Sequence, residues 1–98
     1  MDRGLKAFLA VAQEGSITAA ASKINLTQSS VTKRIATLES ETGVSLFYRD
    51  RRGMSLTEAG QLFLLRAERI EQECQHGMEE LAIIRDAGIS RLSVGAGS

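Results

Sequence analysis

Apolar residues recur at helical spacing over most of the chain, and the polar residues between them mark where helices begin and end. Leu5, Phe8, Leu9 and Ala12 repeat with helical periodicity, and Gly15 follows them as the expected C-terminal cap. This pattern predicts a first, structural helix.

Two further helices are predicted across a tight turn. Ser16 is the expected N-cap of the second helix, whose three alanines at 19–21 allow a neighbouring helix to approach closely. This helix should end near Asn25, a residue type that tolerates left-handed backbone geometry. Thr27 is the expected N-cap of a third helix, which closes at Gly43.

The third helix has two contrasting faces. Its apolar stripe comprises Val31, Ile35 and Leu38. A helix that enters the DNA major groove needs short side chains, hydrogen-bond donors and few carboxylates. The face opposite the stripe and its flanks meet this need with Ser29, Thr32, Lys33, Arg34, Ala36 and Thr37. Glu39 and Glu41 come only at the far end, away from the turns that usually read bases.

The segment from Val44 to Thr57 predicts a short β-hairpin. Leu46, Phe47 and Leu56 lie at its ends, whereas its middle is charged and contains a glycine. The ends should therefore pack on the core and the tip should lie in water. Arginines at such a tip can follow phosphates or enter a minor groove, and here they are Arg49, Arg51 and Arg52.

A long helix should begin at Thr57 and Glu58 and reach Ala87, with Gly88 as its stop signal. Apolar and small residues recur within it at spacings that alternate between four and three, which is a heptad pattern. We call this set the seam: Phe63, Ala67, Ile70, Cys74, Gly77, Leu81 and Ile84. One small domain cannot bury so long a stripe, so we expect the seam to pair with a second copy of the chain, parallel or antiparallel.

The last residues predict the first strand of a further domain. Leu92 and Val94 alternate with polar residues, and a lone strand is not stable by itself. We therefore expect the chain to be the N-terminal piece of a longer protein. The expected division is a DNA-binding domain over 1–57, a linker and dimerisation helix over 58–88, and the start of a missing domain over 89–98.

The length of 98 residues suffices for about one small domain. The absence of proline favours helix, so composition supports a mostly α-helical protein. Its zero net charge hides an uneven distribution. Residues 1–57 hold 8 Lys and Arg against 5 Asp and Glu, a balance of +3, and residues 58–98 hold 4 against 7, a balance of −3. Neither a secretion signal nor a membrane segment is recognisable, so we expect a cytoplasmic protein without membrane contact.

The sequence does not predict an enzyme, a cofactor or a metal site. No nucleophile, base and orienting group form a set, and no glycine-rich phosphate loop follows a strand. The lone His76 has no second ligand at metal-binding spacing. Cys74, the single cysteine, is most simply a small buried apolar residue, because no second cysteine is present to support redox sensing.

Several ordered motifs resemble the N-terminal part of LysR-type transcriptional regulators. They are EGS at Glu14–Ser16, the following alanine pair, TQSSVTKRIATLE from Thr27, GVSLF at Gly43–Phe47, the arginine hairpin and LTEAG at Leu56–Gly60. RLSVGAGS at the C-terminus resembles the first strand of that family's effector-binding domain. The resemblance covers nearly the whole chain.

The resemblance implies a winged helix-turn-helix that reads a partly symmetric double-stranded DNA site as a homodimer, usually within a tetramer. A small-molecule effector would act only through the missing C-terminal domain. The implied recognition helix carries Gln28, Ser29, Ser30, Thr32, Lys33 and Arg34, and the implied wing carries Arg49, Arg51 and Arg52. The family commonly has proline where Ser29 stands, so base preference at this position should differ.

We expect Lys23, Thr27, Arg49 and Arg52 to contact phosphates, whereas Gln28, Ser29, Thr32 and Lys33 discriminate bases. One alternative is a winged-helix module that binds protein and uses its long helix as a coiled-coil adaptor. That alternative does not explain an arginine hairpin beside a carboxylate-poor helix face. A regulator of another architecture with a related N-terminal domain, such as a molybdate-responsive one, is a second alternative.

Overall fold

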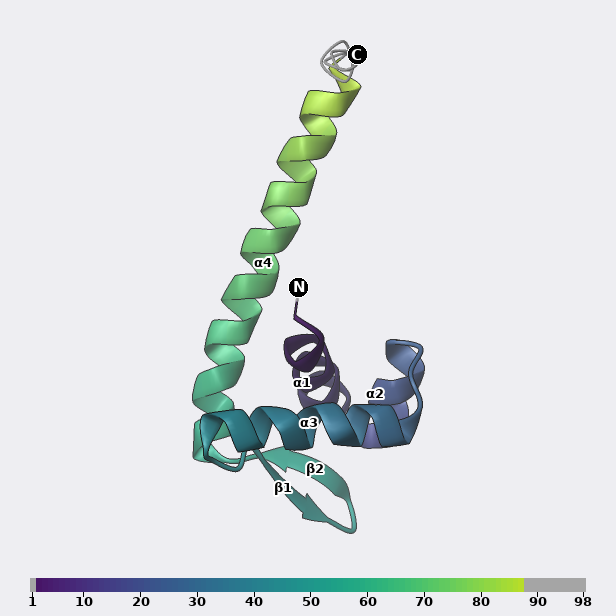
Figure 1. Ribbon diagram of the computed structural model, residues 1–98, viewed down its shortest axis with the longest axis vertical. Helices are drawn as coiled ribbons and strands as arrows, with labels where there is room; N and C mark the ends of the chain where they lie inside the picture. Colours follow the sequence, from purple (N-terminus) through teal and green to yellow (C-terminus); the bar gives the residue numbers. More distant parts are fainter. Residues whose placement is uncertain (1, 88–98) are drawn as a thin grey trace. The chain divides into compact units, whose positions relative to one another are not determined.

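The computed structural model describes residues 2–87, which form four helices and one hairpin (Figure 1). The elements are α1 (Arg3–Glu14), α2 (Ile17–Lys23), α3 (Gln28–Thr42), β1 (Phe47–Asp50), β2 (Gly53–Leu56) and α4 (Glu58–Asp86). The expected stop at Gly88 and the expected strand after it lie outside the described residues. Contacts divide the chain into a first unit, Met1–Glu68, and a second unit, Arg69–Ser98.

Local caps mark where the first three helices begin and end, at the residues that the sequence predicts. The hydroxyls of Ser16 and Thr27 each accept a hydrogen bond from the backbone N–H three residues later, at 3.0 and 3.1 Å. Gly15 and Gly43 close α1 and α3 in the left-handed region, with φ of 74° and 76°. Asn25, at φ 56°, turns the chain between α2 and α3. The predicted helix-turn-helix is confirmed.

The predicted hairpin is also confirmed. Strands β1 and β2 pair antiparallel, with Phe47 opposite Leu56 at the base and Asp50 opposite Gly53 at the tip. Phe47 is buried, whereas Asp50 and the two turn residues after it are exposed. The hairpin therefore has an apolar base and a charged tip, as its sequence requires.

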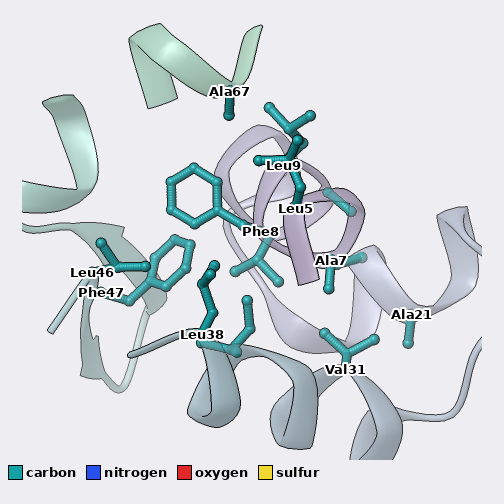
Figure 2. Close-up of a cluster of buried hydrophobic side chains, with 14 residues drawn as sticks. Leu5, Ala7, Phe8, Leu9, Ala21, Val31, Leu38, Leu46, Phe47 and Ala67 are labelled. Atoms are coloured by element: carbon teal, nitrogen blue, oxygen red, sulfur yellow. The ribbon is translucent and has the colours of Figure 1, made fainter. Parts of the chain in front are cut away.

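Phe8 lies at the centre of the core of the first unit and is fully buried. Its ring packs against Phe47 of β1, with the centroids 5.3 Å apart, and edge-on against Phe63 of α4, at 4.9 Å. Figure 2 shows Phe8 beside Phe47 and Leu46. One α1 side chain thus joins the hairpin and the start of α4 to the helical core.

Thr57 and Gly60 fix the junction between the hairpin and α4. The Thr57 hydroxyl donates to the Ser45 carbonyl at 2.7 Å and accepts from the Gly60 N–H at 2.9 Å. Thr57 also donates its own N–H to the Leu46 carbonyl at 3.0 Å. A Cβ at Gly60 would lie 2.1 Å from that same carbonyl oxygen, so α4 can start here only with glycine at this position.

The first turns of α4 belong to the core of the first unit, which corrects part of the seam prediction. Phe63 packs on Phe8, and Ala67 is fully buried within the single chain. Ala67 therefore cannot contact a partner helix, whereas Phe63 is half-buried and is shared between its own domain and the surface. The first unit accordingly extends to Glu68, beyond the boundary expected at Thr57.

The described part of the second unit, residues 69–87, is helical up to Asp86, and its apolar side chains are largely exposed. Ile70, Leu81 and Ile84 of the seam are 50%, 66% and 49% exposed. Cys74 is also exposed, so its expected burial does not occur within one chain. In residues 2–87 we find no helix with the length and apolar character needed to cross a membrane.

Gly60→Ala should destabilise the first unit by about 1–3 kcal/mol, because the new methyl group overpacks the junction against backbone. Urea or thermal unfolding followed by circular dichroism measures this loss. Gly77→Ala is the matched control, since nothing lies within 4 Å of its Cβ position. It should be neutral or stabilise α4 by up to about 1 kcal/mol through helix propensity. Equal stability of the two variants would contradict the close approach at Gly60.

Candidate nucleic-acid interface

Helix α3 presents a polar face to solvent because its apolar stripe is anchored in the core. Val31 and Ile35 are fully buried, and Leu38 is 9% exposed. Around the rest of the helix, Gln28, Ser29 and Lys33 are exposed, and Ser30, Thr32 and Arg34 are half-buried. The six residues expected on the recognition helix are therefore all accessible, and they extend from its first turn to its middle.

The charge on this face is positive. The segment from Gln28 to Leu38 contains Lys33 and Arg34 but no Asp or Glu. Within residues 2–87, the ion pairs are Lys23 with Glu14 and Arg85 with Asp86. Lys33 and Arg34 are thus free of carboxylate partners and available to an anionic ligand.

Glu39 is the first carboxylate on α3, and its role is structural. Its Oε2 accepts hydrogen bonds from the backbone N–H groups of Leu46, at 2.7 Å, and Phe47, at 3.3 Å. This carboxylate satisfies the backbone donors where the chain enters β1 and ties the hairpin to α3. Reasoning from sequence had placed Glu39 only at the far end of the helix and missed this role, because its partners lie seven and eight residues away.

The side chains of Thr27 and Lys23 both already make contacts within the chain. The Thr27 side chain is exposed but caps α3, so its hydroxyl oxygen already accepts one hydrogen bond. The Lys23 ammonium group donates to Gln13 and lies 3.5 Å from the Glu14 carboxylate, both near the end of α1. Lys23 therefore differs from the other expected DNA-binding residues, because Glu14 partly neutralises its charge.

The hairpin tip carries three exposed arginines with no ion pair among the described residues. Arg51 and Arg52 form the turn, and the Arg52 N–H donates to the Asp50 carboxylate at 2.8 Å. Arg49 lies one step below the tip, opposite Met54. Asp50 thus shapes the turn, while the guanidinium groups remain free to contact a partner.

A close backbone contact docks this wing on the turn between α1 and α2. The Met54 N–H donates to the Gly15 carbonyl at 3.0 Å. Gly53 lies so near that a Cβ there would be 2.4 Å from the Gly15 oxygen, and its φ of 129° also requires glycine. The wing and the helix-turn-helix therefore form one compact arrangement.

This combination suits DNA in its physical chemistry. A helix with short polar side chains can enter a major groove, and unpaired cations beside it can bind phosphates. The part of the chain that the structure describes contains no group of three His, Cys, Asp or Glu side chains suited to hold a metal ion.

Comparison with known proteins identifies relatives of this arrangement. Residues 3–61 match the family model described as the bacterial regulatory helix-turn-helix protein, lysR family. The chain is 40% identical over 93 residues to the HTH-type transcriptional regulator ClcR of Pseudomonas putida, covering 95% of this chain and 30% of ClcR. It is 50% identical over 66 residues to YofA of Bacillus subtilis, covering 67% of this chain and 23% of YofA. The chain thus spans less than a third of these curated relatives.

Solved structures include relatives with DNA. The structure is similar to that of the CbnR_DBD–DNA complex, with a TM-score of 0.77 and 36% identity over 87% of this chain and 99% of that one. The BenM_DBD/benA site 1 DNA complex gives a TM-score of 0.80 and 30% identity over 87% and 97% of the two chains. Full-length CbnR, a LysR family transcriptional regulator, matches 84% of this chain with 29% of its own length, at a TM-score of 0.76 and 37% identity.

Gly53→Ala should detach the wing from the Gly15 carbonyl, because the methyl group cannot fit the 2.4 Å gap. We expect a loss of about 1–3 kcal/mol in stability and faster hydrogen exchange at the Met54 amide. Gly43→Ala is the control: it too imposes a positive φ on alanine, at about 1–2 kcal/mol, but has nothing within 4 Å. A Met54 amide equally protected in both variants would show that the wing does not depend on this contact.

Proposed function

The chain belongs to the LysR family of bacterial helix-turn-helix regulators, and we propose that it binds specific double-stranded DNA as the N-terminal part of a transcription regulator. The observation that carries this proposal is the polar, carboxylate-free part of α3 from Gln28 to Leu38, beside a wing whose three arginines form no ion pair within residues 2–87. Relatives crystallised with DNA support it. The relatives are transcription regulators, so the proposed activity is binding and not catalysis.

We propose separate tasks for the side chains of the interface. Gln28, Ser29, Thr32 and Lys33 read base edges in the major groove, because they lie in the first turns of α3. Backbone phosphates are bound by Thr27, Ser30, Arg34 and the wing residues Arg49, Arg51 and Arg52. Lys23 is a weaker candidate than these, since Glu14 shares its charge.

Dimerisation is proposed through the exposed seam positions of α4: Ile70, Cys74, Gly77, Leu81 and Ile84. Four of these side chains are exposed and Gly77 is half-buried in the single chain, and their alternating spacing suits a partner helix. Two recognition helices related by a two-fold axis would meet successive major grooves about 34 Å apart. The proposed DNA site is therefore partly symmetric.

The remaining parts of the proposal come from the family. Since the relatives are more than three times longer than the matched segment, an effector-binding domain after the linker helix would receive a small molecule. We propose that the full-length protein acts in the cytoplasm as a homodimer that assembles into a tetramer. This chain by itself would then bind DNA without responding to an effector.

A protein-binding winged helix with an adaptor helix is the competing function. It predicts little affinity for DNA and does not explain why the cations on both α3 and the wing form no ion pairs among the described residues. Fluorescence anisotropy of this chain with a mixed-sequence duplex at several salt concentrations separates the two. Binding that weakens steeply with salt supports DNA contact, whereas no binding at low salt supports the adaptor.

Lys33→Ala should cost about 1–3 kcal/mol of binding free energy on the selected site if Lys33 contacts a base. The loss on a scrambled duplex should be clearly smaller, because base contacts discriminate between sequences. Anisotropy titration of both duplexes measures the difference. Equal losses on the two duplexes would make Lys33 a phosphate contact.

Leu81→Ala should weaken dimerisation at least about tenfold, because fully burying a leucine is worth about 1.5–3 kcal/mol. Ile83→Ala is the matched control: Ile83 is 68% exposed and lies about 160° around the helix from Leu81. Sedimentation equilibrium measures both dissociation constants. An equal effect of the two variants, or none from either, would contradict a dimer through the seam.

A further inference from the structure

A hollow of about 390 Å³, bordered by charged residues, hydroxyl side chains and Leu38, lies between the first turn of α1 and the middle of α3. Arg3 and Gly4 border it from α1, and Ser30, Lys33, Arg34 and Thr37 border it from α3. Both helices belong to the first unit. Arg3 is far from α3 in sequence, at the first position of α1.

The hollow brings together three cations, none of which forms an ion pair among residues 2–87. Arg3, Lys33 and Arg34 lack an ion pair within 4.0 Å among the described residues. Two carboxylates also border the hollow, Asp2 and Glu41. The Asp2 carboxylate is committed to capping α1, since it accepts a hydrogen bond from the Leu5 N–H at 3.0 Å. Three cations and two carboxylates leave the lining of the hollow with a net charge of +1, which favours an anionic ligand.

The position of the hollow points to the DNA backbone as the source of that anion. Ser30, Arg34 and Thr37 lie at i, i+4 and i+7, so they form one flank of α3 next to Arg3. When a helix occupies a major groove about 12 Å wide, its flanks face the phosphates of the groove walls. A guanidinium group can bind such a phosphate through two parallel hydrogen bonds.

The hollow and the wing lie at opposite ends of α1. Arg3 is the first residue of α1, whereas the wing docks on Gly15, just after its last residue. A helix of 12 residues is about 18 Å long. Cationic groups are thus available for the backbone at two well-separated places.

We propose that Arg3 and Arg34 bind one DNA phosphate in this hollow, at the opposite end of α1 from the wing. This site rests on the proposed DNA-binding function and adds α1 to the elements that position α3 in the groove. The contact carries no base information, so it strengthens binding to every sequence alike.

Arg3→Ala in the full 98-residue chain tests the site. Affinity for a mixed-sequence duplex should fall about tenfold. The slope of log affinity against log salt should become shallower by up to about 0.9, the value for one whole phosphate, because Arg34 still contacts the shared phosphate. The loss should be equal on the selected site and a scrambled duplex. Arg3→Lys should keep the slope but bind less tightly, because an ammonium group cannot make the bidentate contact.

Lys6→Ala is the matched control, because Lys6 is an exposed cation on the same helix that does not border the hollow. Its salt slope should stay at that of the unsubstituted chain. Equal slopes for Arg3→Ala and Lys6→Ala would overturn the site. If the unsubstituted chain shows no salt-dependent binding, the DNA-binding function itself fails, and the site fails with it. Anisotropy with and without added inorganic phosphate, at constant ionic strength, distinguishes a backbone phosphate from a site for the free anion. If inorganic phosphate weakens DNA binding by the unsubstituted chain but not by Arg3→Ala, the hollow is a site for the free anion.

Discussion

The packing of Phe8 against Phe47 and Phe63 is the contact on which the rest of the first unit depends. These three rings come from α1, β1 and α4, which are distant in sequence. Aromatic pairs add about 0.5–1.5 kcal/mol each beyond the apolar area that they bury. The wing and α4 both pack against one α1 residue. The position of the cationic wing is therefore fixed by the same core that anchors the apolar stripe of α3.

Burial alone does not orient elements, because the hydrophobic effect is non-directional. Hydrogen bonds at three places supply the direction. Glu39 ties α3 to the start of β1, Thr57 ties the hairpin base to α4, and the Met54 N–H reaches the Gly15 carbonyl near the wing tip. The sheet has only two strands, and an isolated two-stranded hairpin is only marginally stable in water. Anchors along its length therefore explain how it can present arginines in a defined place.

Sequence reasoning succeeded where the deciding physics is local. The caps at Ser16, Thr27 and Gly43 depend on residues within one turn, and the faces of α3 follow from helical spacing. It failed where one pattern suits two partners: heptad spacing could not tell that Phe63 and Ala67 pack inside their own chain. It also missed what only the fold brings together, namely the ion pair of Lys23 with α1 and the hollow that Arg3 borders together with residues of α3.

The zero net charge of the chain is compatible with a DNA-binding face because acids and bases have different tasks in the first unit. Residues 1–57 contain five carboxylates, and four of them make hydrogen bonds or an ion pair within the chain: Asp2, Glu14, Glu39 and Asp50. Of the eight cations in the same segment, only Lys23 is paired among the described residues. The carboxylates are fixed at helix ends and turns, where they satisfy backbone donors or hold Lys23. The cations therefore dominate the exposed face of α3 and the wing, whatever the total charge.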